Sequence, residues 1–193
     1  MYELQAAAAV GQMGLIQVYE SCFSAHGLHT AQILLTHADL ADRERYLNAR
    51  STLRTLLTLG VIPVINENDS VATEELKFGD NDALSSRLAG IVRADLLILF
   101  TSVDGLMPPG ETERIVEQVD DIQQVLAFAR DEKGEYSTGG MISKLRAVES
   151  AVNAGVETII ANGRRPQQIP DLVAGEGIGT RFAPRGRAQP PAA

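Results

Sequence analysis

Two short clusters of amides and carboxylates lie close together in the sequence. Asn66-Glu67-Asn68-Asp69 follows an apolar run, and Gly79-Asp80-Asn81-Asp82 comes shortly after it. Carboxylates can bind an ammonium group, hold lysines in place or bind a metal ion, while amides can orient the rest of a zwitterion. Turn formation and helix capping account for Gly79 and for one of Asp80 or Asn81. They do not account for two dense clusters, so the pattern favours a site for a small zwitterion.

A second stretch, Thr138-Gly139-Gly140-Met141-Ile142-Ser143-Lys144, has the composition of a phosphate-binding helix start. Glycines there let backbone N–H groups approach a phosphate, and the helix dipole favours its negative charge. Lys144 follows Gly140 by four residues, which is about 6 Å along a helix axis, so its side chain can reach back to a phosphoryl group. The spacing is not that of a P-loop. A flexible Gly-Gly linker with a surface lysine is the alternative interpretation.

A third stretch, 100–106, ends an apolar run with two hydroxyls and a turn. Thr101 and Ser102 come first, and Asp104-Gly105 follows. These residues can line a nucleotide pocket, but an ordinary turn after a strand explains them equally well.

The periodicity of apolar residues predicts alternating helices and strands. Helices are expected over 3–25, 40–58 with Asp39 as N-cap, about 81–92, 120–130, 138–154 and 166–174; strands are expected over 29–36, 61–66, 95–100, 115–119, 158–162 and, at a sheet edge, 179–182. This alternation predicts an α/β sandwich with a largely parallel sheet, in which ligands bind at the carboxyl ends of strands. Polar clusters fall at three such ends, 66–69, 101–104 and 162–165. Gly11 and Gly14, inside the first helix, indicate close packing against a neighbour.

Composition and charge limit the class of protein. The chain has 193 residues, 45% of them hydrophobic, and a net charge of −8. One globular domain over 1–183 and a loose tail over 184–193 are expected. The negative charge disfavours a nucleic-acid binder, and no apolar run is long enough to cross a membrane. The single cysteine, Cys22, fits a reducing cytoplasm.

Taken together, these stretches resemble the glutamate 5-kinase branch of the amino acid kinase family. The matching segments run in the expected order from about residue 6 to residue 182: AAAVGQMGLIQVYE, QILLTHADLADRERYLNAR, VIPVINENDSVAT, FGDNDALSSRLA, LLILFTSVDGLM, TGGMISKLRAV and AGVETIIANGRRP. The resemblance implies a three-layer αβα sandwich with a mainly parallel sheet. It implies transfer of the γ-phosphoryl group of ATP, with Mg²⁺, to the side-chain carboxylate of L-glutamate, the first step of proline biosynthesis. It also implies a cytoplasmic homo-oligomer, a dimer or tetramer, with glutamate-5-semialdehyde dehydrogenase as a further partner.

The resemblance also assigns roles by position, with no protein residue assigned as a metal ligand. Glutamate would be bound by Asp69 and Asn81, with Asn66 nearby, and Asp82 would organise the active-site lysines. The nucleotide would be contacted by Thr101 and Ser102. Its phosphates would be held by Thr138, Gly139, Gly140, Met141, Ile142, Ser143 and Lys144, and Lys144 would also neutralise charge on the transferred group. The attacking carboxylate is already a nucleophile, so no general base is required.

The chain departs from the family pattern in three ways. The family's glycine-rich loop with a phosphate-binding lysine and its Ser-Gly-Ala loop lie upstream of the matching region, and an RNA-modification-type domain lies downstream of it in many relatives. The resemblance therefore implies a chain that lacks these segments, with activity impaired by loss of the phosphate-binding lysine. Ser102 stands where relatives commonly carry aspartate. Two alternatives therefore stay open: a non-catalytic glutamate-binding or oligomerisation module, and an amino acid kinase acting on acetylglutamate or aspartate. A free-amine pocket at Asp69 argues against an acylated amine.

Overall fold

The structure is a computed structural model that describes residues 2–72, 81–108, 111, 114–131 and 139–185. The chain divides into two compact units, Met1–Leu84 and Ser85–Ala193.

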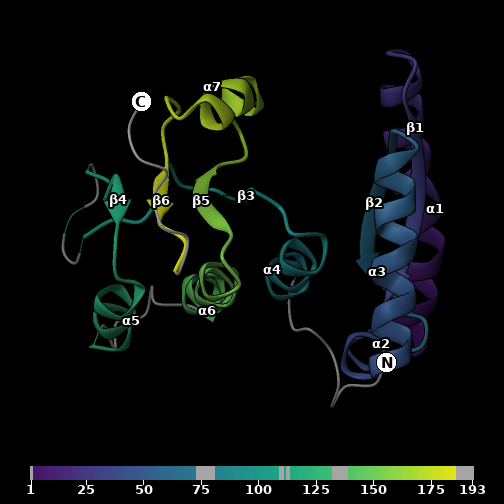
Figure 1. The fold of residues 1–193 in the computed structure, drawn as a ribbon, viewed down its shortest axis with the longest axis horizontal. Helices are drawn as coiled ribbons and strands as arrows, with labels where there is room; N and C mark the ends of the chain where they lie inside the picture. The colour runs from purple at the N-terminus through teal and green to yellow at the C-terminus, as the bar shows by residue number, and fades with distance from the viewer. Residues whose placement is uncertain (1, 73–80, 109–110, 112–113, 132–138, 186–193) are drawn as a thin grey trace. The chain divides into compact units, whose positions relative to one another are not determined.

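The first unit is built on a pair of parallel strands. Its elements are α1 (Tyr2–Ser24), β1 (His29–Leu35), α2 (His37–Ala41), α3 (Arg43–Thr58) and β2 (Val61–Glu67). β1 and β2 pair in parallel, which requires a crossover, and α2 and α3 supply it. α1 contacts β1 and α3 contacts β2 (Figure 1). The register sets Leu35 opposite Glu67, so the loops that follow both strands begin side by side.

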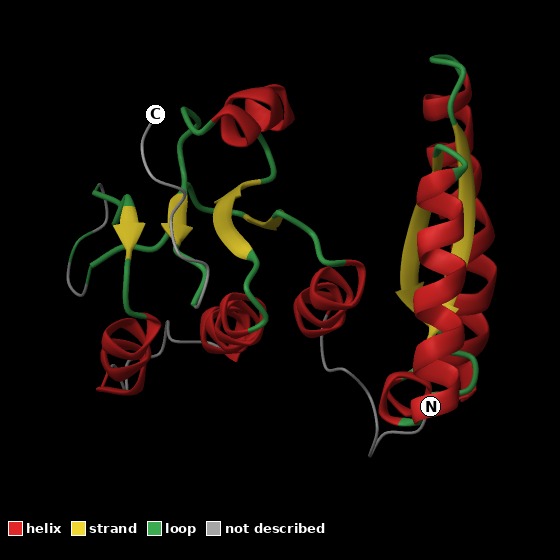
Figure 2. Cartoon of the chain, viewed as in Figure 1, coloured by secondary structure: helices red, strands yellow, loops and turns green. Residues whose placement is uncertain are grey.

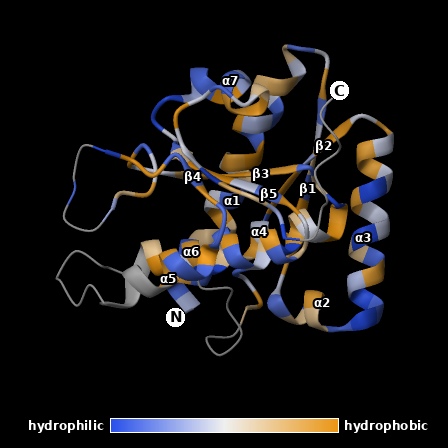
Figure 3. Cartoon of the chain, turned by 60° about the vertical axis from the view of Figure 1, so that its left-hand side comes forward, coloured by the Kyte–Doolittle hydropathy of each residue, from blue (hydrophilic) through white to orange (hydrophobic). Residues whose placement is uncertain are grey.

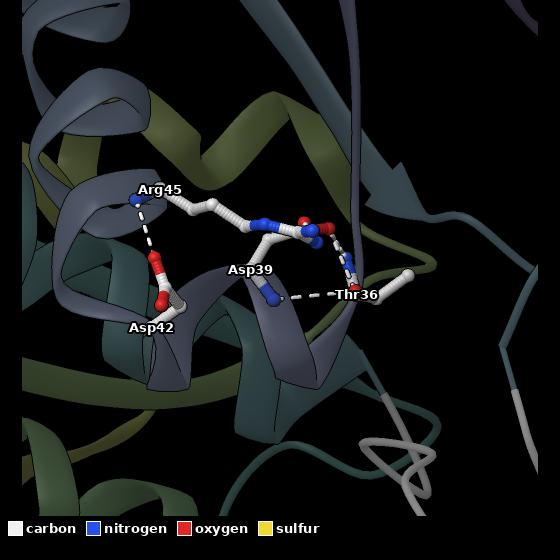
Figure 4. Close-up of polar contacts among 4 residues, drawn as sticks. All are labelled: Thr36, Asp39, Asp42 and Arg45. Atoms are coloured by element: carbon white, nitrogen blue, oxygen red, sulfur yellow. Dashed lines mark hydrogen bonds and ion pairs between the residues drawn. The ribbon is translucent and has the colours of Figure 1, made fainter.

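The sequence 36–45 begins two helices, not one (Figure 4). Thr36 is the N-cap of α2: its Oγ1 accepts from Asp39 N at 3.3 Å, and Asp39 Oδ2 accepts from Thr36 N at 2.8 Å. Asp42 is the N-cap of α3, and its Oδ1 accepts from Arg45 N at 2.9 Å. The prediction of one helix over 40–58 capped by Asp39 was therefore wrong. Asp42 satisfies the free N–H of a new helix, which ends α2 after a single turn.

Helix α1 has no buried residue among those described. A Cβ added at Gly11 or Gly14 would meet no described atom within 4 Å. The close packing expected at these glycines is therefore not present in the described part of the chain. Large apolar side chains on this helix, Tyr2, Leu4, Val10, Met13 and Val18, are mostly exposed.

The second unit is a four-stranded sheet with helices on both faces. Its strands are β3 (Leu96–Thr101), β4 (Gln118–Val119), β5 (Glu157–Asn162) and β6 (Thr180–Phe182), in the order β3-β5-β6-β4. Its helices are α4 (Asn81–Val92, of which 85–92 belong to this unit), α5 (Ile122–Asp131), α6 (Gly139–Asn153) and α7 (Ile169–Ala174), the last preceded by a 3-10 turn at Pro166–Gln168. α7 lies on one face, and α4, α5 and α6 lie on the other (Figures 1 and 2). This unit has the predicted three layers.

Strand pairing is parallel for β3–β5 and β4–β6, and antiparallel for β5–β6. The prediction that 179–182 forms an edge strand was wrong, because β6 lies between β5 and β4. Gly179 explains the close pairing: a Cβ there would lie 2.8 Å from Ile160 O, so only glycine fits. The strand expected over 115–119 is limited to β4, and the helix expected over 166–174 begins as the 3-10 turn.

The core of the second unit packs α5 and α6 against the sheet. Leu145, Val148, Ile160 and Phe182 are at most 1% exposed within one apolar cluster. In the first unit Leu53 of α3 is fully buried. Hydrophobic and hydrophilic residues alternate along α3 in Figure 3, as expected for a helix with one face on a sheet.

Candidate functional site

In the second unit, residues from two distant parts of the sequence meet at the carboxyl end of β3. Thr101 ends this strand and is half-buried, and Ser102 follows it and is exposed. Lys144, from α6, is only 8% exposed, and its Nζ donates to Phe100 O at 3.4 Å. The lysine therefore lies beside the strand end that carries Thr101.

Helix α6 begins at Gly139, the first glycine of the pair predicted to open it. The first four N–H groups of a helix have no partner within the helix, and the dipole is positive there, so this end can bind an anion. Met141, Ile142 and Ser143 are half-buried on the first turn and a half. Thr138, also predicted to hold phosphate, lies outside the described residues.

A polar link fixes the turn after β3 to the end of β5. Asn162 Nδ2 donates to Asp104 Oδ1 at 2.8 Å, and Arg165 Nη2 lies 3.4 Å from Asp104 Oδ2. Asn162 Oδ1 accepts from Arg164 N at 2.9 Å. The register pairs Thr101 with Asn162, so this link joins the loops of two adjacent parallel strands. It holds the turn next to Thr101 and Ser102 in one conformation.

The same turn is also held from β6. Leu106 N donates to Thr180 Oγ1 at 2.8 Å, and a Cβ at Gly105 would lie 2.7 Å from that oxygen. A glycine is therefore required for Thr180 to make this bond.

In the first unit, residues of the polar cluster at the end of β2 border a cavity of about 360 Å³. Its lining includes Gln12 and Gln17 of α1, together with Glu67, Asn68 and Asp69. Asn66 Nδ2 donates to Gln12 Oε1 at 2.9 Å. Asn68 N donates to Leu35 O at 2.9 Å, which ties the cluster to the end of β1. Carboxylates and amides thus line the same cavity. The binding of a zwitterion by these residues stays a prediction.

A larger cavity, of about 760 Å³, lies at the ends of the same two strands. It is lined by apolar residues of β1 and by polar residues of α2, of α3 and of the loops after the strands, among them Thr36, Asp39, Arg45 and Asn68. The hydrogen bond from the Thr36 hydroxyl, followed by those from the Thr36 backbone and Arg45, holds the pKa of Asp39 below its ordinary value against the opposing effect of burial. Asp39 is thus ionised at neutral pH and forms an ion pair with Arg45 Nη1 at 3.0 Å.

The remaining predicted substrate residues open α4. Asn81 is exposed and Asp82 is half-buried in the first turn of that helix. Their roles in binding glutamate and in organising lysines stay predictions, as do the nucleotide roles of Thr101 and Ser102.

The described residues contain neither a cluster suited to a metal ion nor a helix suited to cross a membrane. No group of three or more histidine, cysteine, aspartate and glutamate side chains among them is arranged to hold a metal ion. None of the described helices combines the length and the hydropathy needed to cross a membrane.

Comparison with known proteins identifies the family. The model of the amino acid kinase family matches residues 1–162. The chain belongs to the amino acid kinase family. Among its curated relatives, a protein named glutamate 5-kinase from Nitrosococcus oceani is 52% identical over 189 residues, which are 95% of this chain and 50% of the relative. The chain thus spans about half the length of the curated relatives it matches.

Solved structures agree on the fold of this family member. Carbamate kinase from Giardia superposes with a TM-score of 0.66 at 19% identity, over 93% of this chain and 73% of the other. Carbamate kinase from Giardia lamblia bound to AMP-PNP gives a TM-score of 0.52 at 20% identity, over 69% and 44%. The predicted fold class and family are confirmed.

Sequence reasoning missed Gln12 and the Asp104–Asn162 link. The signal for Gln12 was present: it is a lone polar residue between Gly11 and Met13 in an otherwise apolar part of α1. The signal for the link was weaker, because asparagine and aspartate after strands are common turn formers.

Proposed function

We propose that this protein transfers the γ-phosphoryl group of ATP to the side-chain carboxylate of L-glutamate, giving glutamyl 5-phosphate in the first step of proline biosynthesis. The observation that carries the proposal is the 52% identity, over 95% of the chain, to a relative named glutamate 5-kinase. In the reaction, a carboxylate oxygen forms a bond to the γ-phosphorus, the bond from that phosphorus to the leaving oxygen breaks, and ADP departs with the electron pair.

Within the second unit, the proposal assigns nucleotide binding to the start of α6 and the end of β3. When bound, ATP supplies an electrophilic phosphoryl group that carries negative charge through the transition state. The N–H groups at the start of α6 would bind its phosphates, and the ammonium of Lys144 would offset the developing charge at the end of β3. The link between Asp104 and Asn162 would keep Thr101 and Ser102 in position for the nucleotide.

Within the first unit, the proposal assigns glutamate binding to the polar cluster at the end of β2. Asp69 would pair with the free amino group, and Asn66 and Asn81 would orient the carboxylates. No general base is required because a carboxylate is ionised at neutral pH. This part of the chain therefore binds and orients, and no residue in it has to remove a proton.

Several finer features belong to the same proposal. Mg²⁺ would enter with ATP, because this ion is usually held by substrate phosphates and one or two carboxylates. We also propose a homo-oligomer, a dimer or tetramer, in the cytoplasm, and glutamate-5-semialdehyde dehydrogenase as the partner that receives the labile acyl phosphate.

Trapping of the acyl phosphate tests the proposal. The 193-residue chain is incubated with ATP, Mg²⁺ and hydroxylamine, and the hydroxamate is measured with L-glutamate, N-acetylglutamate or L-aspartate as acceptor. Hydroxamate is expected with L-glutamate. Product with another acceptor and not with L-glutamate would assign a different substrate, and no product together with no binding of L-glutamate in calorimetry would refute the proposal.

A further inference from the structure

Only one end of the Gln12 amide has a known partner in the described structure. Its Oε1 accepts the hydrogen bond from Asn66 Nδ2 at 2.9 Å. Its Nε2 is buried and has no hydrogen-bond partner among the described residues. A buried N–H group without a partner is costly and rare in native proteins, so such a group calls for a ligand or an ordered water.

The orientation of this amide is fixed by Asn66. Because Asn66 presents a donor, it selects the oxygen of Gln12, and the Nε2 group must point elsewhere. Gln12 is also part of the lining of the 360 Å³ cavity that includes Glu67 and Asp69. The residues that line the cavity therefore combine carboxylates, which bind cations, with the Gln12 amide, whose N–H group binds only an acceptor.

We propose that Gln12 is a substrate-binding residue whose Nε2 donates a hydrogen bond to the α-carboxylate of the bound amino acid. This inference rests on the proposed function, which makes L-glutamate the ligand. The side-chain carboxylate of glutamate must face the phosphoryl donor, and the amino group on the α-carbon pairs with Asp69. The acceptor next to that amino group is the α-carboxylate.

Two substitutions of Gln12 test the loss of its N–H donor separately from other effects of changing the side chain. Gln12→Glu keeps an oxygen that accepts from Asn66 and removes the N–H donor, whereas Gln12→Met removes the donor without adding charge. Gln5 supplies the matched control, since it lies on the same helix and its Nε2 donates to Ala72 O at 3.1 Å, a backbone atom. Gln5→Glu and Gln5→Met thus remove a glutamine donor that serves the fold alone.

The measurement is calorimetric binding to the 193-residue chain of two ligands that differ by one group. L-glutamate carries the α-carboxylate, and 4-aminobutyrate is the same molecule without it. Both Gln12 variants are expected to weaken L-glutamate binding by about 10-fold to 100-fold, the usual effect of losing a buried hydrogen bond to a charged group. Binding of 4-aminobutyrate is expected to change less than about 3-fold in Gln12→Met, and the Gln5 variants are expected to leave the ratio of the two affinities unchanged.

Each other outcome overturns the inference. Equal weakening of both ligands would mean that Gln12 acts only through the fold, and unchanged L-glutamate binding would mean that a water satisfies Nε2. In both cases the wild-type chain still binds L-glutamate, so the proposed function survives. If the folded wild-type chain neither binds L-glutamate nor forms the hydroxamate, the proposed function fails and the inference fails with it. Thermal unfolding of each variant checks folding, and agreement between the Glu and Met variants makes the result independent of either one.

Discussion

Replacing Lys144 by methionine separates the charge of this side chain from its packing. Lys144 lies on α6 and is 8% exposed, so nearly all of its side chain is buried. Methionine has a similar length and a flexible apolar chain, so it can fill the same space. What the Lys144→Met variant removes is an ammonium group beside the carboxyl end of β3.

The two expected effects differ in size. The hydrogen bond from Nζ to Phe100 O, at 3.4 Å, is longer than the usual range, so its loss costs about 1 kcal/mol or less. Removing a buried charge also relieves a desolvation cost, which offsets part of that loss. Loss of a preorganised cation at the transferred group, by contrast, lowers kcat by about 100-fold to 1,000-fold, as loss of one oxyanion-hole donor does.

The assay compares hydroxamate formation with urea unfolding for Lys144→Met and for a control, Arg146→Met. Arg146 is an exposed cation on the same helix, so its replacement should leave both quantities nearly unchanged. Lys144→Met should lose activity and keep a free energy of unfolding within about 1 kcal/mol of wild type. A variant with normal turnover, or one destabilised by more than about 3 kcal/mol, would show that the lysine serves the fold and not phosphoryl transfer.

Three further outcomes follow from the contacts. Gly105→Ala should lower the free energy of unfolding by about 1–3 kcal/mol in urea titrations, because its Cβ would lie 2.7 Å from Thr180 Oγ1; an unchanged midpoint would contradict this packing. Thr36→Val should raise the pKa of Asp39 toward its ordinary value in an NMR titration, because the Thr36 hydroxyl is the largest cause of the lowered value. In the wild type the Asp39 carboxyl binds its proton less tightly in the folded protein, so its contribution to stability is present above about pH 4 and is lost as the pH falls below that value. Equal loss of stability in acid for the wild type and Thr36→Val would argue against the contact between Thr36 and Asp39. Leu53→Ala should cost about 2–5 kcal/mol, since Leu53 is fully buried in the first unit.

Much of the second unit could be predicted from the sequence. Apolar runs bounded by turn residues predicted the ends of β3 and β5 to within a residue or two, and the Gly-Gly pair predicted the start of α6. The rule that ligands bind at the carboxyl ends of parallel strands then selected Thr101 and the residues after Asn162. These features are local or follow from one general rule of sheet topology.

The errors arose where several local signals competed or where partners were distant in sequence. Asp39 and Asp42 are both good N-caps three residues apart, and only the structure shows that Thr36 and Asp42 cap separate helices. The central place of β6 in its sheet depends on Gly179 and on pairing with β5, which no local pattern encodes. Local propensity cannot identify a strand's neighbours when the strand is three residues long.

The two units place their polar residues by the same physical rule. Leu35 pairs with Glu67 in the first unit, and Thr101 pairs with Asn162 in the second, so each parallel pair ends with two loops starting side by side. In each unit a side chain from a helix then reaches that end: Gln12 contacts Asn66, and Lys144 contacts Phe100. Parallel pairing is therefore enough to gather the loop residues, which explains why the sequence revealed them. The helical side chains depend on the packing of a helix against the sheet, and this is why Lys144 needed a glycine signature to be noticed. Gln12 has no such signature and emerged only from its Nε2 group, which has no partner among the described residues.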